Sequence, residues 1–205
     1  MKLTWYGHAC FLIETGEGSV LLDPYAPGSV PGLKLPRVTA DLVLCSHEHR
    51  DHGYREGVRL SGKTPALRLE KLSVFHDDRG GALRGPNTIH ILEAEGLRVV
   101  HLGDLGHPLS SEQIAALGRV DILLIPVGGH YTIGPGIAAE LAEALKPGIT
   151  VPMHYRGDGF GYDVIGPVED FLRLRDPVAR LESNVLRPEE LNTPVTVVLH
   201  CPTAD

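Results

Sequence analysis

The sequence predicts an α/β fold in which mixed strands form the core and helices pack outside them. Three observations support this class: short apolar runs of strand length recur, segments with helical apolar spacing lie between the later runs, and turn residues separate them. Of the 205 residues, 42% are hydrophobic and 22% charged, which is ordinary for a globular protein and excludes disorder as the main state. No linker divides the sequence, so we expect one domain over residues 1–205.

The N-terminal part of the chain predicts strands joined by a tight turn and followed by a loop. The turn falls at Gly16–Gly18, and the Pro- and Gly-rich stretch Pro24–Pro36 is the loop. The run Asp41–Cys45 is wholly apolar behind one aspartate, which is typical of a strand covered on both faces. The strands expected here are Leu3–Tyr6, Cys10–Thr15, Val20–Asp23 and Asp41–Cys45.

The rest of the chain alternates strands with helices. Ser110 or Ser111 can cap a helix over Glu112–Leu117, and Gly118 ends it. Further helices are expected at Gly136–Leu145 and Pro167–Leu174. The strands expected in this part are Leu72–His76, Thr88–Glu95, Leu97–Leu102, Asp121–Val127, Ile149–Met153 and Val195–Leu199.

Charge and composition exclude several kinds of partner. The formal net charge is −7 and no basic run occurs, which argues against a nucleic-acid or anionic membrane surface. No window approaches the roughly 20 apolar residues of a membrane span, and the first residues do not have the pattern of a signal peptide. The three cysteines are isolated, so we expect no disulfide framework and a cytoplasmic location. A small molecule is the expected partner.

Histidine is abundant, with 11 residues, and its placement points to a metal site. His47, His49, Asp51 and His52 follow the expected strand Asp41–Cys45 within six residues. Such a loop can direct two side chains toward one metal ion and two toward another. The alternative is that this is a surface loop in which these four residues occur together by chance.

Three later strands each end in another ligand-type residue. His76, Asp104 and His154 follow apolar strands, and strand ends of an open α/β sheet converge at one edge. Taken alone, each of these residues could have a structural role instead of binding metal; Asp104, for example, could simply be a turn residue. Together with the first motif, the pattern favours a shared metal centre.

This set of residues resembles the metallo-β-lactamase superfamily. HEHRDH fits that family's H-x-H-x-D-H signature, and the later ligands follow in the family's order. Within the superfamily the chain looks most similar to the small group related to ascorbate-6-phosphate lactonase, and more distantly to N-acyl-phosphatidylethanolamine phospholipase D. The supporting stretches are TWYGHACFLIET, LLDPY, RGPNTIHILEAEGLRVVHLGDLGH, IPVGGHYTIG and VPMHY. The resemblance implies a four-layer αββα sandwich with mixed sheets and the metals at one end.

The resemblance also implies a role for each ligand. One metal site would use His47, His49 and His76, the other would use Asp51, His52 and His154, and Asp104 would bridge them. His76 follows His52 by only 24 residues, where many superfamily members carry a longer insertion. We therefore expect a pocket that is open or built from other loops.

The donors are nitrogen and oxygen only, which suits Zn2+ or Mn2+, with Fe also compatible, as one or two ions. Water is then the nucleophile, and Asp51 is expected to orient it as well as to ligate. His130 is the candidate general acid; its alternative is a packed loop histidine. His8 and Asp23 are expected to hold a ligand in position, with a structural role as the alternative for His8.

Four further residues flank the expected ligands in the sequence. Arg84 and Arg156 could bind a phosphate or carboxylate, or could be exposed loop arginines. Asn87 and Tyr155 are candidates for support of the site or contact with substrate. The small-molecule substrate could therefore be anionic. By analogy with relatives that assemble, a homo-oligomer is one option.

The function expected from these residues is hydrolysis of a small ester, lactone or phosphoester at a metal centre. One alternative is a di-iron redox protein, but such members carry Glu in place of the second histidine, and position 49 is His. Another is a non-catalytic metal-binding or sensor protein. A purely structural site is usually closed and often Cys-rich, whereas this donor set leaves positions for substrate.

Overall fold

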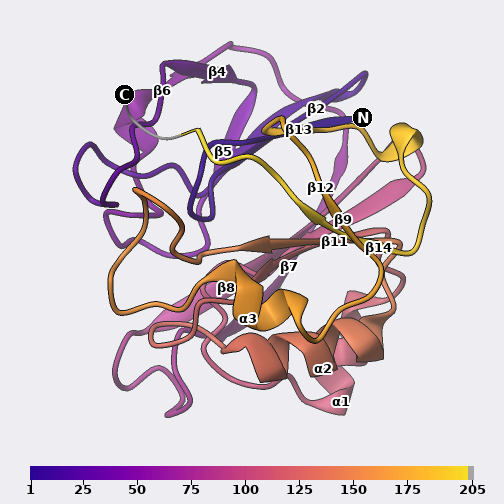
Figure 1. Ribbon diagram of the computed structural model, residues 1–205. Helices are drawn as coiled ribbons and strands as arrows, with labels where there is room; N and C mark the ends of the chain where they lie inside the picture. The colour runs from indigo at the N-terminus through magenta and orange to yellow at the C-terminus, as the bar shows by residue number, and fades with distance from the viewer. Residues whose placement is uncertain (203–205) are drawn as a thin grey trace.

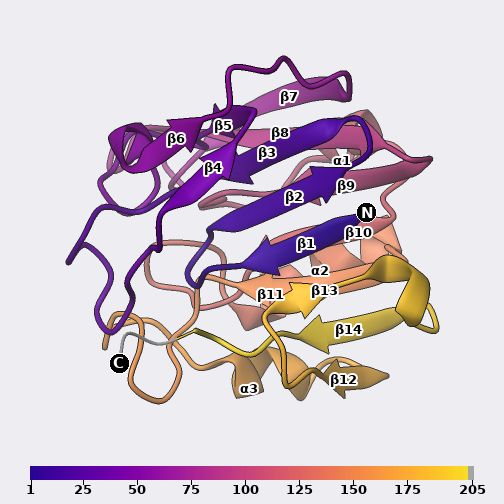
Figure 2. The same ribbon diagram turned by 90° about the horizontal axis from the view of Figure 1, so that it is seen from above.

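Two β-sheets pack against each other in the computed structural model, which describes residues 1–202 (Figures 1 and 2). The first sheet has the order β13-β1-β2-β3-β5. Its central strands form an antiparallel meander, and β3 pairs with β5 in parallel. Its strands are β1 (Lys2–Trp5), β2 (Phe11–Thr15), β3 (Gly18–Leu22), β5 (Leu42–Leu44) and β13 (Val185–Leu186).

The second sheet has seven strands in the order β12-β14-β11-β10-β9-β8-β7. Strands β7, β8 and β9 are antiparallel, whereas β9, β10, β11, β14 and β12 run parallel. Its strands are β7 (Arg68–Phe75), β8 (Pro86–Ala94), β9 (Leu97–His101), β10 (Ile122–Pro126), β11 (Ile149–Met153), β12 (Val178–Arg180) and β14 (Val195–Val198). Every residue of β10 and β11 is buried, as expected for parallel strands covered on both faces.

The helices α1 (Ser111–Leu117), α2 (Pro135–Leu145) and α3 (Val168–Leu172) lie on the outer face of the seven-stranded sheet (Figure 1). Ser110 caps α1 through a capping box with Gln113, and Gly118 ends it, as the sequence predicts. The α/β sandwich with mixed sheets is thus confirmed. Near the five-stranded sheet lie a small parallel pair, β4 (Val38–Ala40) and β6 (Val58–Leu60), and the 3-10 turn η1 (Arg55–Gly57). A second 3-10 turn, η2, spans Pro188–Glu190.

Apolar side chains of both sheets form one core cluster. Trp5 is fully buried, and its ring packs against Phe11, Tyr155 and Phe160. The Trp5 indole nitrogen donates to the carbonyl of His8, which satisfies its one polar atom. This core therefore reaches directly to the turn between β1 and β2.

The structure corrects two strand expectations and adds short strands. Strand β5 is half-buried instead of covered on both faces, because it lies at the edge of its sheet. Strand β7 begins at Arg68, earlier than expected, since its first half pairs along the length of β8. The sequence did not predict β4, β6, β12 or β13, each of two or three residues.

In residues 1–202 no helix has the length and apolar character needed to cross a bilayer. The three cysteines are free thiols. The segments that follow β5, β7, β9 and β11 each carry expected metal ligands, and the strand ends position the site described next.

Candidate metal centre

Eight side chains form a cluster of metal-capable donors, called here the donor cluster. They fall into three overlapping groups whose ligand atoms lie within 4.8 Å of one another. The first group comprises three imidazoles, the second holds three imidazoles and one carboxylate, and the third links them through an aspartate. The members are His8, His47, His49, Asp51, His52, His76, Asp104 and His154.

Asp104 lies at the middle of the donor cluster. Its Oδ2 is 3.2 Å from Nε2 of both His52 and His154, 3.3 Å from Nε2 of His76 and 4.0 Å from Nε2 of His47. The backbone nitrogen of Asp104 donates to Oδ1 of Asn87, which fixes the loop after β9. One carboxylate oxygen thus faces imidazoles of both expected metal sites.

The first group is His47, His49 and His76. The ring centroids of His47 and His49 are 4.6 Å apart, and those of His47 and His76 are 4.7 Å apart. His47 and His76 are buried, whereas His49 is exposed. This group therefore opens to solvent on the side of His49.

The second group is His8, Asp51, His52 and His154. Nε2 of His8 lies 3.3 Å from Oδ2 of Asp51. The His8 ring lies 4.0 Å from the His154 ring and 4.9 Å from the His52 ring, between centroids. The three imidazoles are buried and Asp51 is half-buried, so this group is more enclosed than the first.

The donor cluster fits a bound cation. Among the described residues, seven buried side-chain atoms of the cluster have no hydrogen-bond partner: Nδ1 of His8 and His76, Nε2 of His47 and His52, both ring nitrogens of His154, and Oδ1 of Asp104. Buried polar atoms without partners are rare, and each costs about 1–3 kcal/mol. Nε2 of His52 and Nε2 of His154 both lie 3.2 Å from Oδ2 of Asp104, and a metal ion that the cluster would share explains so many unpartnered atoms in one place.

Comparison with known proteins also points to a family of metal-dependent enzymes. Residues 2–154 match the β-lactamase superfamily domain. The chain is 32% identical to a metal-dependent hydrolase of Thermoplasma volcanium, over 92% of this chain and 96% of the relative. It is 35% identical to a solved structure of the metallo-β-lactamase superfamily from Thermotoga maritima, with a TM-score of 0.75 and coverage of 97% and 98% of the two chains. The chain belongs to the metallo-β-lactamase superfamily.

A more distant solved structure supports the fold alone. The metallo hydrolase Igni18 from Ignicoccus hospitalis is 22% identical, with a TM-score of 0.62, over 99% of this chain and 96% of that one. The two-sheet arrangement of this metallo-β-lactamase fold is therefore shared over nearly the whole length of both chains.

Asp23 supports one imidazole from each group of the metallo-β-lactamase centre. Its Oδ2 lies 2.8 Å from Nδ1 of His52, and its Oδ1 accepts from the backbone nitrogen of Ser46 at 2.6 Å. The Ser46 hydroxyl donates to Asp23 and lies 3.0 Å from Nδ1 of His47. Burial would raise the pKa of Asp23, but the charge of His52 and its hydrogen bond hold that pKa well below its usual range.

Burial favours the neutral form of several imidazoles of the donor cluster. Burial, with the charge of His52, lowers the pKa of His47 to about 3. Burial, with the charge of His154, lowers the pKa of His8 to about 4. Burial opposes protonation of His52 too, but the carboxylates of Asp104 and Asp23 outweigh it and raise its pKa well above the usual value. Neutral imidazole is the form that binds metal.

Of the flanking residues predicted from sequence, Asn87 and Tyr155 are buried. The Asn87 side chain donates to the carbonyl of Leu102 and accepts from the backbone nitrogen of Asp104, so it positions the loop after β9 that carries Asp104. The Tyr155 ring packs in the core against Trp5. In residues 1–202 Tyr155 is not a member of any donor group, and its role in support of the site or in contact with substrate stays a prediction.

The two arginines differ. The Arg84 guanidinium lies 5.6 Å from the centroid of the Tyr131 ring. Arg156 donates through Nε to the carbonyl of Ile165, and it lines surface hollows that no donor of the cluster lines. Arg84 thus remains a candidate for substrate contact, whereas Arg156 serves the loop that follows His154.

His130 lies on an exposed loop, with its ring edge-on to Tyr131 at 4.5 Å between centroids. In residues 1–202 it is not a member of any donor group. Its role as a general acid stays a prediction.

Sequence reasoning missed two residues of the centre. Tyr162 donates its hydroxyl to the carbonyl of Ser29 at 2.6 Å and lies 3.2 Å from Oδ2 of Asp51. Since 111 residues separate Tyr162 from Asp51, no local pattern indicates the contact. Ser46 directly precedes the histidine motif, so its position could have been a signal.

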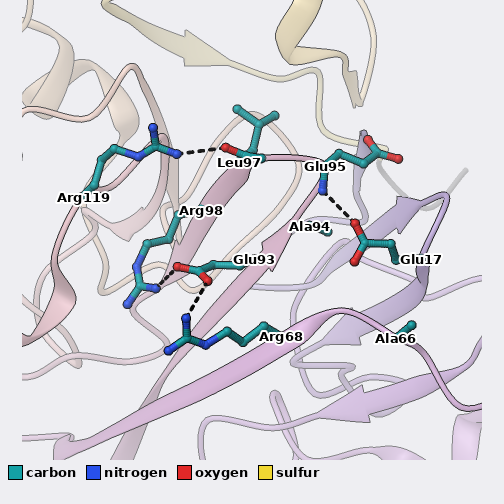
Figure 3. A pocket seen from close by; sticks show the side chains of 10 residues that line it. Glu17, Ala66, Arg68, Glu93, Ala94, Glu95, Leu97, Arg98 and Arg119 are labelled. Carbon is teal, nitrogen blue, oxygen red and sulfur yellow. Dashed lines mark hydrogen bonds and ion pairs between the residues drawn. The ribbon is translucent and has the colours of Figure 1, made fainter.

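A charged hollow at the opposite end of β8 and β9 is distinct from this centre (Figure 3). Arg98 pairs there with Glu93 and Glu70, and Arg68 pairs with Glu93. Arg119 donates to the carbonyl of Gly96. Most of the arginines and glutamates that line this hollow are therefore paired with one another.

Proposed function

We propose that the protein is a metal-dependent hydrolase that cleaves a small ester, lactone or phosphoester with water. The observation that carries this proposal is the position of Asp104, whose Oδ2 faces imidazoles of both groups at 3.2–3.3 Å. A carboxylate in this position suits a two-ion centre, because it can serve both ions. The relative from Thermoplasma volcanium, named a metal-dependent hydrolase, supports the same reaction class.

The donor set suits Zn2+ or Mn2+, and also accommodates Fe, because it combines imidazoles with carboxylates and has no thiolate. The relative from Thermotoga maritima is provisionally named a zinc-dependent hydrolase. Bound divalent ions would lower the pKa of water to about 7 and stabilise a developing oxyanion. No Ser or Cys nucleophile is then required.

The protein's own residues would supply orientation and protons. Asp51, whose Oδ2 lies 3.3 Å from Nε2 of His8 and 3.2 Å from the Tyr162 hydroxyl, would accept a hydrogen bond from the attacking water. His130 would donate a proton to the leaving group from its exposed loop. Asp23 would keep the His52 ring oriented toward the centre during turnover.

The substrate is proposed to be small and anionic. Arg84 has no carboxylate partner among the described residues, and the aromatic face of Tyr131 holds its guanidinium. An unpaired arginine suits a phosphate or carboxylate group. The sequence motifs that resemble the ascorbate-6-phosphate lactonase group are the reason for proposing a lactone or phosphoester over a large substrate.

The test begins with elemental analysis of the purified protein. The same sample is then offered a panel of lactones and phosphodiesters, with and without a chelator. We expect one or two equivalents of Zn or Mn and turnover that the chelator abolishes. His49→Ala and Asp104→Ala should lose activity, whereas His200→Ala, a change at an exposed histidine, should retain it.

Full activity in folded His49→Ala or Asp104→Ala protein would refute the proposal. Iron that cycles with reductant, without hydrolysis, would instead support a redox protein. Metal-loaded protein that hydrolyses no member of the panel would support a binding or sensor role.

A further inference from the structure

His8 is fixed by its backbone in the turn between β1 and β2. Its carbonyl accepts from the Trp5 indole and from the backbone nitrogen of His154, both at 3.1 Å. The adjacent Gly7 has φ +93°, and a side chain there would meet Leu33 at 2.6 Å. The turn thus tolerates little movement, and the His8 side chain is 1% exposed.

The imidazole of His8 faces the second group of the donor cluster. Its Nε2 is 3.3 Å from Oδ2 of Asp51, and its ring stacks at a tilt on His154, 4.0 Å between centroids. A ligand atom of His8 lies within 4.8 Å of those of Asp51, His52 and His154. No other group of the cluster in residues 1–202 assembles four side chains.

The distances between donor atoms are close to those between two ligand atoms bound to the same metal ion. Ligand atoms about 2.0–2.1 Å from a tetrahedral ion are about 3.3 Å apart. Oδ2 of Asp104 lies 3.2 Å from Nε2 of His52 and of His154, and His8 lies 3.3 Å from Asp51. His8 therefore has the same spacing to its neighbour as the expected ligands have to theirs.

We propose that His8 is a fourth side-chain ligand of the second metal site, together with Asp51, His52 and His154. This makes the two sites unequal. The second site has four side-chain donors of its own, three of them wholly enclosed, whereas the first has three, of which His49 is exposed. The second site is then filled first and released last. This inference concerns metal binding only and does not depend on which bond the protein hydrolyses.

The competing role for His8 is a hydrogen bond that holds Asp51 without touching the metal. Glutamine separates the two roles, because its amide can donate to Asp51 but is a poor replacement for imidazole as a ligand. Loss of a supporting hydrogen bond typically lowers metal affinity about 10–100-fold. Loss of a ligand should exceed that range even when the hydrogen bond is kept.

The experiment measures Co2+ binding by competition with a coloured chelator at fixed pH. His49→Ala serves as the reference protein, since it weakens the first site and leaves the second intact. We expect His8→Gln and His8→Ala, each added to His49→Ala, to raise the Co2+ Kd more than about 100-fold. His200→Ala added to His49→Ala is the matched control and should leave the Kd unchanged. A His8→Gln affinity within a few-fold of the reference would overturn the proposal.

A second measurement needs no change at His8 and covers the case in which those variants fail to fold. X-ray absorption of His49→Ala protein with one equivalent of Co2+ counts the imidazoles bound to the ion. We expect three, from His8, His52 and His154. A count of two would show that His8 stays outside the coordination sphere.

Discussion

Three of the six non-glycine residues with left-handed backbone in residues 1–202 belong to the metal centre or support it. His8, Asp23 and His154 have φ of 52°, 46° and 52°, and His130, outside the donor groups, has φ of 61°. Each such conformation costs on the order of 1–3 kcal/mol and persists only where the surroundings enforce it. The bond from the His154 nitrogen to the His8 carbonyl joins two of these residues directly. The strain is therefore part of how the fold aims these side chains.

His130 can be tested with a residue that accepts the same backbone. Asparagine tolerates the left-handed region but cannot act as an acid near neutral pH. His130→Asn should keep stability within about 0.5 kcal/mol. If His130 protonates the leaving group, kcat should fall about 10²–10⁴-fold. Thermal unfolding and steady-state kinetics on the best substrate of the panel measure both; unchanged kcat would assign His130 to loop packing.

Asp23 should control metal retention without touching the metal. In Asp23→Asn the carboxylate that accepts from His52 and Ser46 is replaced by an amide, so the His52 ring loses its orientation. We expect a 10–100-fold weaker metal affinity, measured by chelator competition. Ser46→Ala, which removes only the hydroxyl between Asp23 and His47, should weaken metal affinity by a smaller factor. Equal affinity in Asp23→Asn and the unmodified protein would contradict this role.

The seven expected ligands could be predicted from the sequence because four of them share one loop and the other three follow apolar strands. The residues that support the site were harder to predict. Tyr155 follows His154 directly in the sequence, yet its ring lies in the core, because the chain leaves β11 at Met153 and turns through the left-handed backbone of His154. Tyr162 reaches Asp51 from a loop whose path no local sequence pattern specifies.

At the scale of elements, the loop between β7 and β8 is organised by one buried carboxylate. Oδ1 of Asp77 accepts from the backbone nitrogens of Arg79 and Gly81, and Oδ2 accepts from those of Leu83 and Arg84. Burial would raise the pKa of Asp77, but these four bonds outweigh it and lower that pKa to about 2. The loop thereby places Arg84 against Tyr131.

Asp77 should make the folded state sensitive to acid in a defined range. Because its pKa is lower in the folded state than the ordinary 3.8, its stabilisation is complete above about pH 4 and is lost as the pH falls toward about 2. Asp77→Asn removes this dependence. The difference in melting temperature between the two proteins should be largest above pH 4 and should shrink toward pH 2. A constant difference across this range would contradict the assignment.

Element prediction succeeded where the pattern was long or wholly apolar. Strands β10 and β11 and helix α1 have strong local signals in the form of continuous apolar runs and a capping box. The short strands β4 and β13 have three and two residues, too few for any periodicity. Their pairing depends on partners far away in the chain; β13 pairs with β1 at the N-terminus.

For the whole molecule, the metal centre connects the two sheets. His8 and the His47–His52 loop belong to segments of the five-stranded sheet, whereas His76, Asp104 and His154 follow strands of the seven-stranded sheet. Sequence alone predicted that these strand ends converge, but not the strand order, which places β9 and β11 on either side of β10. Strand order depends on long-range pairing that local patterns do not encode.

Because the ligands span both sheets, metal should stabilise the entire fold. Free metal at 100 times its Kd adds about 2.7 kcal/mol to the free energy of unfolding. For a domain of this size that corresponds to a rise in melting temperature of about 5–11 °C. Calorimetry of the metal-saturated and chelator-treated protein measures this shift. Asp104→Ala, which has lost the carboxylate between the two groups, should show a smaller one. If verified metal removal leaves the melting temperature of the unmodified protein unchanged, the centre does not hold the sheets together, and the cluster binds its ion only locally.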